Sequence, residues 1–121
     1  MTALKLRILF DGAMIGPGKA ALLDGIAATG SIAAAGRRMQ MSYKRAWMLV
    51  EEMNAAFALP LVASARGGQG GGGARLTEAG AEVLRLYREV VARSEAAAAE
   101  PIAALEAMLR RKVESELSGG K

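Results

Sequence analysis

The sequence predicts a small α+β domain that is mainly helical, and three features indicate this class. Short helical segments cover residues 19–29, 32–39 and 43–57, and a tight turn joins the second to the third. Two short apolar segments then flank a run of glycines, as in a β-hairpin. A long helical stretch begins at residue 78. Strand, three helices, hairpin and helix in this order make a winged helix-turn-helix, with the hairpin as the wing.

The first 30 residues predict one strand, a loop and a helix. Apolar side chains alternate through 4–10, which gives a strand with one buried face formed by Leu4, Leu6, Ile8 and Phe10. Three glycines and a proline in 11–18 predict a loop. The helix at 19–29 carries Leu22, Leu23, Ile26 and Ala27 on one side, and Gly30 is a good terminator.

The helix-turn-helix is the predicted centre of function. Ser31 and Ser42 each precede a helix, where a serine oxygen can accept a hydrogen bond from a free backbone N–H group. The apolar stripe of the third helix is Ala46, Val50, Met53 and Phe57, with Trp47 beside it in an expected packing role. Free N–H groups at a helix start suit phosphate. We expect DNA contacts from Ser42, Tyr43, Lys44, Arg45 and Met48, and flanking phosphate contacts from Ser31, Arg37 and Arg38.

The glycine-rich wing lies between two short strands, expected at 60–65 and 74–76. Glycine loses more backbone freedom on folding than any other residue, but its bare backbone can approach phosphates closely. The wing residues expected at DNA are Arg66, Gly67, Gly68, Gln69, Gly70, Gly71 and Arg75. The run also matches the nucleotide-binding pattern G-x-G-x-x-G, but no helix starts at its last glycine and no GK[ST] is present. A flexible hairpin without a binding role is the other alternative.

Two further helices are predicted after the wing. Thr77 is expected to cap a helix over 78–100, and Pro101 either kinks it or opens another helix over 101–117. Their apolar faces exceed what a small domain covers, so we expect a homodimer interface. Its predicted residues are Val83, Leu86, Tyr87, Val90, Ile102, Leu105 and Leu109. The domains are then 1–94, the winged helix, and 95–121, a helical extension that is part of the interface.

Charge and composition narrow the function classes. Net charge is +4, and residues 25–50 hold four cations and no acid, which favours a polyanion such as nucleic acid over a membrane. A basic solvated surface would give the same count. The chain has no cysteine and no histidine, which removes thiol nucleophiles, imidazole bases and the usual zinc sites, so we expect neither an enzyme nor a metal site. No apolar run reaches the about 20 residues of a membrane span, and a cytoplasmic, nucleoid-associated bacterial protein is expected.

Two stretches carry a family resemblance: GSIAAAGRRMQMSYKRAWMLVEEMN and GGQGGGGARLTEAGAEVLRLY. Together they resemble the N-terminal domain of ModE-type, molybdate-responsive regulators, which are similar in turn to LysR-type winged helices. The resemblance runs from about Leu22 to Tyr87. It implies a homodimer that binds a near-palindromic operator and controls molybdate uptake or molybdenum enzymes. It also implies DNA contacts at Ser42, Tyr43, Lys44 and the wing.

The chain departs from the family pattern in two ways. Arg45 and Met48 stand where the family has a small or acidic residue, and Gln69 where the wing more often has Lys, which affects the operator sequence. Full-length members also continue into domains that hold molybdate. We therefore expect no molybdate or other cofactor site in these 121 residues, and either no sensing of molybdate or a separate ligand-sensing partner. The alternative function is a protein-interaction module that works through its C-terminal helices.

Overall fold

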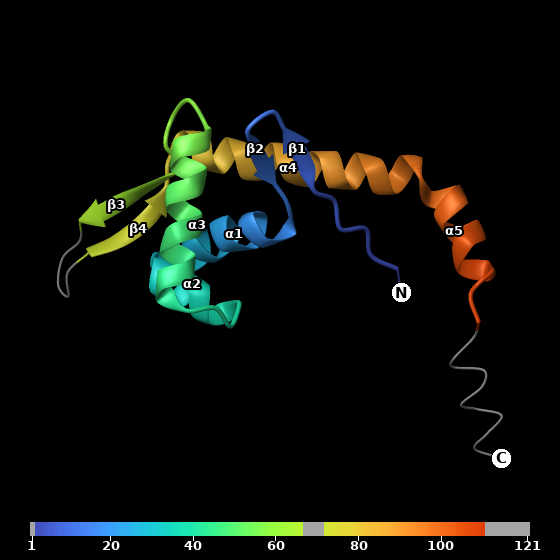
Figure 1. Ribbon diagram of the computed structural model, residues 1–121, viewed down its shortest axis with the longest axis horizontal. Coiled ribbons are helices and arrows are strands. Elements are labelled where there is room, and N and C mark those ends of the chain that lie inside the picture. Colours follow the sequence, from blue (N-terminus) through green and yellow to red (C-terminus); the bar gives the residue numbers. More distant parts are fainter. Residues whose placement is uncertain (1, 67–71, 111–121) are drawn as a thin grey trace, which may run out of the picture. The chain divides into compact units, whose positions relative to one another are not determined.

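The computed structural model describes residues 2–66 and 72–110 (Figure 1). The elements in chain order are β1 (Ile8–Phe10), β2 (Ala13–Ile15), α1 (Pro17–Thr29), α2 (Ile32–Arg38), α3 (Tyr43–Ala56), β3 (Val62–Arg66), β4 (Gly72–Leu76), α4 (Glu78–Ala97) and α5 (Ala99–Ala107). The chain forms two compact units, residues 1–91 and 92–121. The expectations for Gly67 to Gly71 and for a helix beyond residue 110 lie outside the described residues.

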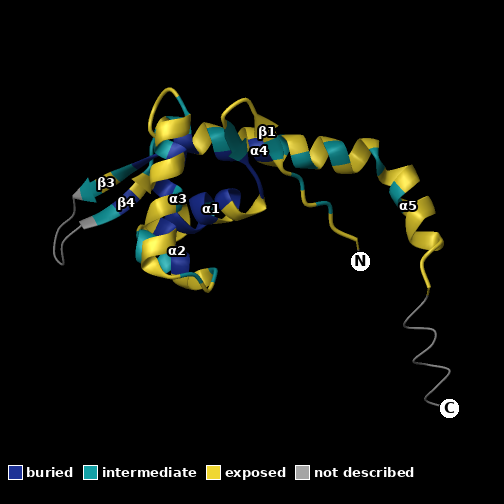
Figure 2. Ribbon diagram, in the orientation of Figure 1, coloured by how far each residue is buried: buried dark blue, intermediate teal, exposed yellow. Residues whose placement is uncertain are grey.

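The core of the first unit lies among α1, α2 and α3, and the hairpin and α4 add to it (Figure 2). Leu22, Leu23 and Ile26 of α1 are fully buried, as predicted, but Ala27 is exposed. Small residues allow the helices to approach closely. A Cβ on Gly25 would lie 2.9 Å from the Cβ of Ala35, and one on Gly36 would lie 3.0 Å from the Cβ of Ala46.

Three predicted helix caps are confirmed. The Oγ of Ser31 accepts a hydrogen bond from Ala34 N (3.0 Å), and that of Ser42 accepts one from Arg45 N (3.1 Å). Thr77 Oγ1 accepts from Gly80 N (3.0 Å) and donates to the carbonyl of Pro60 (2.6 Å). Side-chain oxygens thus satisfy N–H groups that have no partner within the helix.

The N-terminal segment forms a hairpin, which corrects the predicted loop over 11–18. Phe10 pairs with Ala13, so Asp11 and Gly12 form a two-residue turn, and Gly12 has φ 86°. A two-residue turn of this kind needs positive φ, which Asp-Gly sequences supply. The predicted alternation holds at Leu4, Leu6 and Ile8, which are partly buried. Phe10 is 51% exposed and does not belong to the buried face.

The C-terminal helices differ from the predicted bounds. Residue 98 separates α4 from α5, and Pro101 lies in the first turn of α5, so the second of the two alternatives for this proline is confirmed. Helix α5 ends at Ala107, before the predicted residue 117. None of the residues in α5 is buried. Among the described residues, no helix combines the length and apolar character that crossing a bilayer requires.

Candidate nucleic-acid interface

The turn between α2 and α3 is fixed by backbone hydrogen bonds. Gln40 N donates to Arg37 O and Met41 N donates to Gly36 O, both at 3.0 Å. Gln40 takes φ 59°, a left-handed conformation that non-glycine residues seldom adopt. This compact turn sets Ser42 at the start of α3 with its cap formed.

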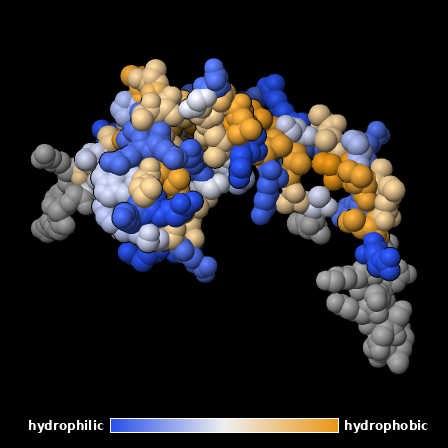
Figure 3. Space-filling model, in the orientation of Figure 1, coloured by the Kyte–Doolittle hydropathy of each residue, from blue (hydrophilic) through white to orange (hydrophobic). Residues whose placement is uncertain are grey.

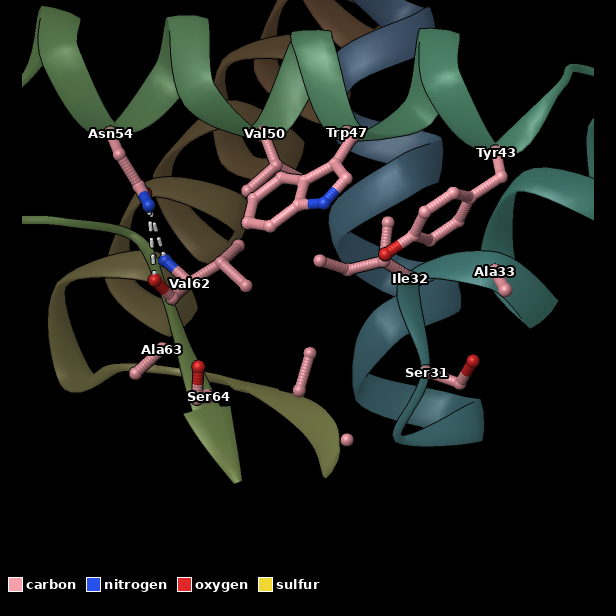
Figure 4. A pocket seen from close by; sticks show the side chains of 12 residues that line it. Ser31, Ile32, Ala33, Tyr43, Trp47, Val50, Asn54, Val62, Ala63 and Ser64 are labelled. Carbon is pink, nitrogen blue, oxygen red and sulfur yellow. Dashed lines mark hydrogen bonds between the residues drawn. The ribbon is translucent and has the colours of Figure 1, made fainter. Parts of the chain in front are cut away.

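The predicted contact residues of α3 are all exposed, but they point in three directions. Tyr43 and Trp47 are one helical turn apart and point toward β3 and α2 (Figure 4). Lys44 lies about 100° further around the helix and Met48 lies one turn after it. Arg45 lies about 200° from Tyr43, on the opposite flank. Tyr43 and Trp47 therefore lie on the side of α3 nearest the hairpin, and Lys44 and Met48 lie on the adjacent side.

The flanking cations Arg37 and Arg38 are exposed in the last turn of α2. Cations there also interact favourably with the helix dipole, which is a structural reason for their presence. Ser31 is half-buried because its hydroxyl caps α2.

The wing is a five-residue antiparallel ladder, in which Val62 pairs with Leu76 and Arg66 pairs with Gly72. Strand β4 begins at Gly72, two residues before the predicted start, so part of the glycine run is strand. Ala74 N donates to Gly30 O (2.9 Å), and a Cβ on Gly73 would lie 2.8 Å from that oxygen. Glycine at 73 thus permits the hairpin to lie against the turn between α1 and α2. Arg75 is exposed on β4.

Asn54 joins α3 to the wing, and sequence reasoning did not identify it. Its Oδ1 accepts hydrogen bonds from Leu61 N (2.8 Å) and Val62 N (3.0 Å), and its Nδ2 donates to Val62 O (3.1 Å). Asn is a poor residue for a helix interior, because its side chain competes for backbone partners. That mismatch was the available signal. These three hydrogen bonds tie α3, the expected recognition helix of the helix-turn-helix, to the first strand of the wing.

A second contact fixes the far end of the hairpin. Thr77 N donates to Leu61 O (2.9 Å), and a Cβ on Gly80 would collide with that same oxygen. Thr77 and Gly80, which lie in the second stretch that carries the family resemblance, are thus required by the packing of α4 against Leu61, just before β3.

An open hollow of about 530 Å³ lies between α2, α3 and the hairpin (Figure 4). Tyr43, Trp47, Val50 and Asn54 line it from α3, and residues of β3 and β4 line it from the other side. Trp47 is 40% exposed, so more than half of the residue is covered, and the rest faces this hollow. The buried stripe of α3 consists of Ala46, Val50 and Met53, and Trp47 lies beside it at the hollow.

The predicted dimer residues divide into three groups. Leu86 and Val90 of α4 are exposed, and Leu105 and Leu109 of the second unit are each 65% exposed. Apolar side chains also gather along these helices on the face that Figure 3 shows. Val83 and Ile102 are partly buried. Tyr87 is a correction: it is buried in the core of its own chain, and its hydroxyl donates to Leu6 O (2.5 Å). Burial raises the pKa of this phenol.

The family model for bacterial regulatory helix-turn-helix proteins of the lysR family matches residues 19–81. The chain therefore belongs to that family. The matched residues contain most of α1, all of α2 and α3, and the wing, so the match covers the geometry described above.

Among curated proteins, the chain is similar to the molybdenum-pterin-binding protein MopB of Rhodobacter capsulatus, with 47% identity over 81 residues. It is 47% identical over 74 residues to the molybdenum transport protein ModE of Herbaspirillum seropedicae. It is 44% identical over 71 residues to the DNA-binding transcriptional dual regulator ModE of Escherichia coli K12. These matches cover 67%, 61% and 59% of this chain and 30%, 28% and 27% of the relatives. The resemblance to ModE-type regulators is thereby confirmed.

A solved structure confirms the fold class. The chain is similar to one in a crystal structure of a CbnR_DBD–DNA complex, with a TM-score of 0.56 and 22% identity. The likeness covers 73% of this chain and 95% of the other. At this identity it concerns the fold alone, which is the winged helix-turn-helix that the sequence predicts.

Proposed function

We propose that this chain is a sequence-specific, double-stranded DNA-binding transcriptional regulator of the ModE type. The observation that carries the proposal is the Asn54 bridge, which holds a Ser42-capped, cation-bearing helix next to the wing. Family membership and a relative named as a DNA-binding transcriptional regulator support it.

The proposed mode of binding follows from the chemistry of the two elements. The start of α3, with Tyr43, Lys44, Arg45 and Met48, enters the major groove, and Ser42 lies near phosphate. Ser31, Arg37 and Arg38 contact the flanking backbone. The wing, from Arg66 to Arg75, follows the neighbouring phosphates. Each phosphate that a cation neutralises releases counterions, so affinity falls as salt rises.

The active form that we propose is a homodimer. Exposed Leu86 and Val90 on α4 support an apolar contact between copies, and the exposed leucines of the second unit support another. Two copies of α3 would read half-sites about 34–36 Å apart, one turn of B-DNA. Light scattering at micromolar concentration tests the dimer, and a monomer would contradict it.

We also propose that the regulated genes concern molybdate transport or molybdenum metabolism, because relatives with these names share up to 47% identity. The chain spans 30% or less of the length of the relatives named above. In this proposal the 121 residues form the DNA-binding part, act on the bacterial nucleoid in the cytoplasm, perform no catalysis and hold no molybdate. A ligand-sensing partner would then supply control. Calorimetry with molybdate tests this, and heat of binding to this chain would contradict it.

Selection of bound fragments from the source genome is the experiment that tests the DNA-binding proposal. It should return duplexes that share a two-fold symmetric sequence. If no fragment is enriched, and the protein shows no affinity for DNA at low salt, the protein-interaction module is the better interpretation.

A further inference from the structure

The hollow between α3 and the wing has no assigned role. The role that we infer for it rests on the proposed function. Its volume of about 530 Å³ is far above the roughly 30 Å³ share of one water molecule. The wall on α3 is aromatic, from Tyr43 and Trp47, and the wall on β3 includes Val62 and Ser64 (Figure 4). In the part of the chain that the structure describes, no charged side chain lines it.

Three polar groups at the hollow are able to donate hydrogen bonds. Tyr43 and Ser64 present hydroxyls, and Trp47 has an indole N–H that can only donate. Among the described residues, none of these three side chains has a hydrogen bond to protein. The amide of Asn54 is already engaged by Leu61 and Val62. The occupant therefore needs an apolar surface for the indole ring and oxygen atoms that accept hydrogen bonds.

The position of the hollow selects the occupant. Its walls are the two elements that the proposed function places on one duplex, α3 and the wing, and Ser31 at the start of α2 closes one end. A DNA strand that passes from the recognition helix to the wing crosses this opening. The sugar of that strand has apolar C–H faces, and its phosphate carries acceptor oxygens.

We propose that the hollow seats one deoxyribose and its adjoining phosphate. The indole of Trp47 packs against the sugar, and the hydroxyls of Tyr43 and Ser64 donate to the phosphate oxygens. Because these groups are neutral, the interaction displaces few counterions. It therefore adds affinity for every sequence without adding to the salt dependence, in contrast to the cations Lys44 and Arg75.

The test compares Trp47→Ala with wild type on a selected duplex and on a scrambled duplex, at several salt concentrations. We expect about tenfold weaker binding to both, which corresponds to about 55 Å² of apolar surface left in water. The slope of log K against log salt should stay unchanged. Hydroxyl-radical footprinting of the complex should show one protected sugar that becomes accessible in the variant.

A second variant approaches the hollow from the opposite wall. Ser64→Leu fills it without altering α3, because Ser64 lies on the face of the hairpin that Val62 and Ala74 share. It should give a similar decrease in affinity, while thermal unfolding reports whether either variant is folded. Wild-type affinity for both variants, or an unchanged footprint, would overturn the inference while wild-type DNA binding stands. A decrease confined to the selected duplex would also overturn it, because Trp47 would then read a base. If wild type binds no DNA, the proposed function itself fails.

Discussion

The side chain of Asn54 forms hydrogen bonds with both backbone groups of Val62, accepting from its N–H at 3.0 Å and donating to its carbonyl at 3.1 Å. One amide thus completes the main-chain bonding of the first residue of β3. Because Asn54 lies in the last turn of α3, these hydrogen bonds join the end of α3 to the start of the wing. This interaction is the structural basis for treating the recognition helix and the wing as one interface.

Asn54→Ala should lower the free energy of unfolding by about 2–3 kcal/mol, because it leaves the partly buried N–H groups of Leu61 and Val62 without their acceptor. Urea denaturation measures the change. Asn54→Asp is the comparison variant, since it keeps the acceptor for Leu61 N and Val62 N but places a charged oxygen, in place of the donor, against Val62 O. An Ala variant as stable as wild type would show that water replaces the bridge at no cost.

Gly80→Ala should destabilise the domain by about 2–4 kcal/mol, because the added methyl group would collide with the backbone of Leu61. Gly18→Ala in the first turn of α1 is the control, since no atom lies within 4 Å of a Cβ there. That change should stabilise by about 0.4–1 kcal/mol through the unfolded chain. Equal thermal midpoints for the two variants would contradict the tight α4–β3 packing.

Tyr87→Phe should change the dependence of stability on pH. Burial raises the pKa of Tyr87 above its ordinary value of 10.0, so the folded protein holds this proton more tightly than the unfolded chain. The stability linked to this proton is complete below about pH 10 and is lost as pH rises through the folded-state pKa. The variant should be less stable by about 1 kcal/mol at neutral pH, because it cannot form the Leu6 hydrogen bond.

Unfolding curves between about pH 8 and about pH 11 would follow that change. The advantage of wild type over Tyr87→Phe should shrink across the upper part of this range. If the stability difference between wild type and Tyr87→Phe instead grows as pH rises, the pKa of Tyr87 is not raised by burial in the folded protein.

Lys44→Ala should weaken DNA binding and reduce the magnitude of the salt slope by about one if the ammonium contacts phosphate. A base contact would instead cost about 1–3 kcal/mol on the selected duplex alone. Lys5→Ala is the control, because it removes the same charge from an exposed position before β1. If the two variants weaken binding equally in a gel shift, Lys44 contributes only through the overall positive charge of the protein and makes no specific DNA contact.

Much of the fold was predictable because its signals are local. Ser31, Ser42 and Thr77 are caps whose side chains act within three residues, so their roles follow from position in the sequence. The N-terminal hairpin also had a local signal, the Asp11–Gly12 pair between apolar residues, which the glycine-rich composition of 11–18 obscured.

The interactions that sequence reasoning missed are between distant segments. The hydroxyl of Tyr87 donates a hydrogen bond to Leu6 O, 81 positions away in the sequence. A helix wheel groups Tyr87 with the exposed apolar residues of α4, because the wheel contains no information about the N-terminal segment. Asn54 and Trp47 face β3, and neither the bridge nor the hollow exists until the hairpin packs there. All predicted DNA contacts stay predictions: those at Ser31, Arg37, Arg38, Ser42, Tyr43, Lys44, Arg45 and Met48, and those of the wing.

The central claim is that α3 and the wing bind one duplex together. The most direct measurement is the salt dependence of affinity for a genome-selected duplex, with wild type, Lys44→Ala, Arg75→Ala and the double variant. Arg75→Ala should reduce the magnitude of the slope by about 0.9, and the double variant should show a reduction of about 1.8 if Lys44 also contacts phosphate. A slope that Arg75→Ala leaves unchanged, or a wild type whose affinity ignores salt, would contradict the claim.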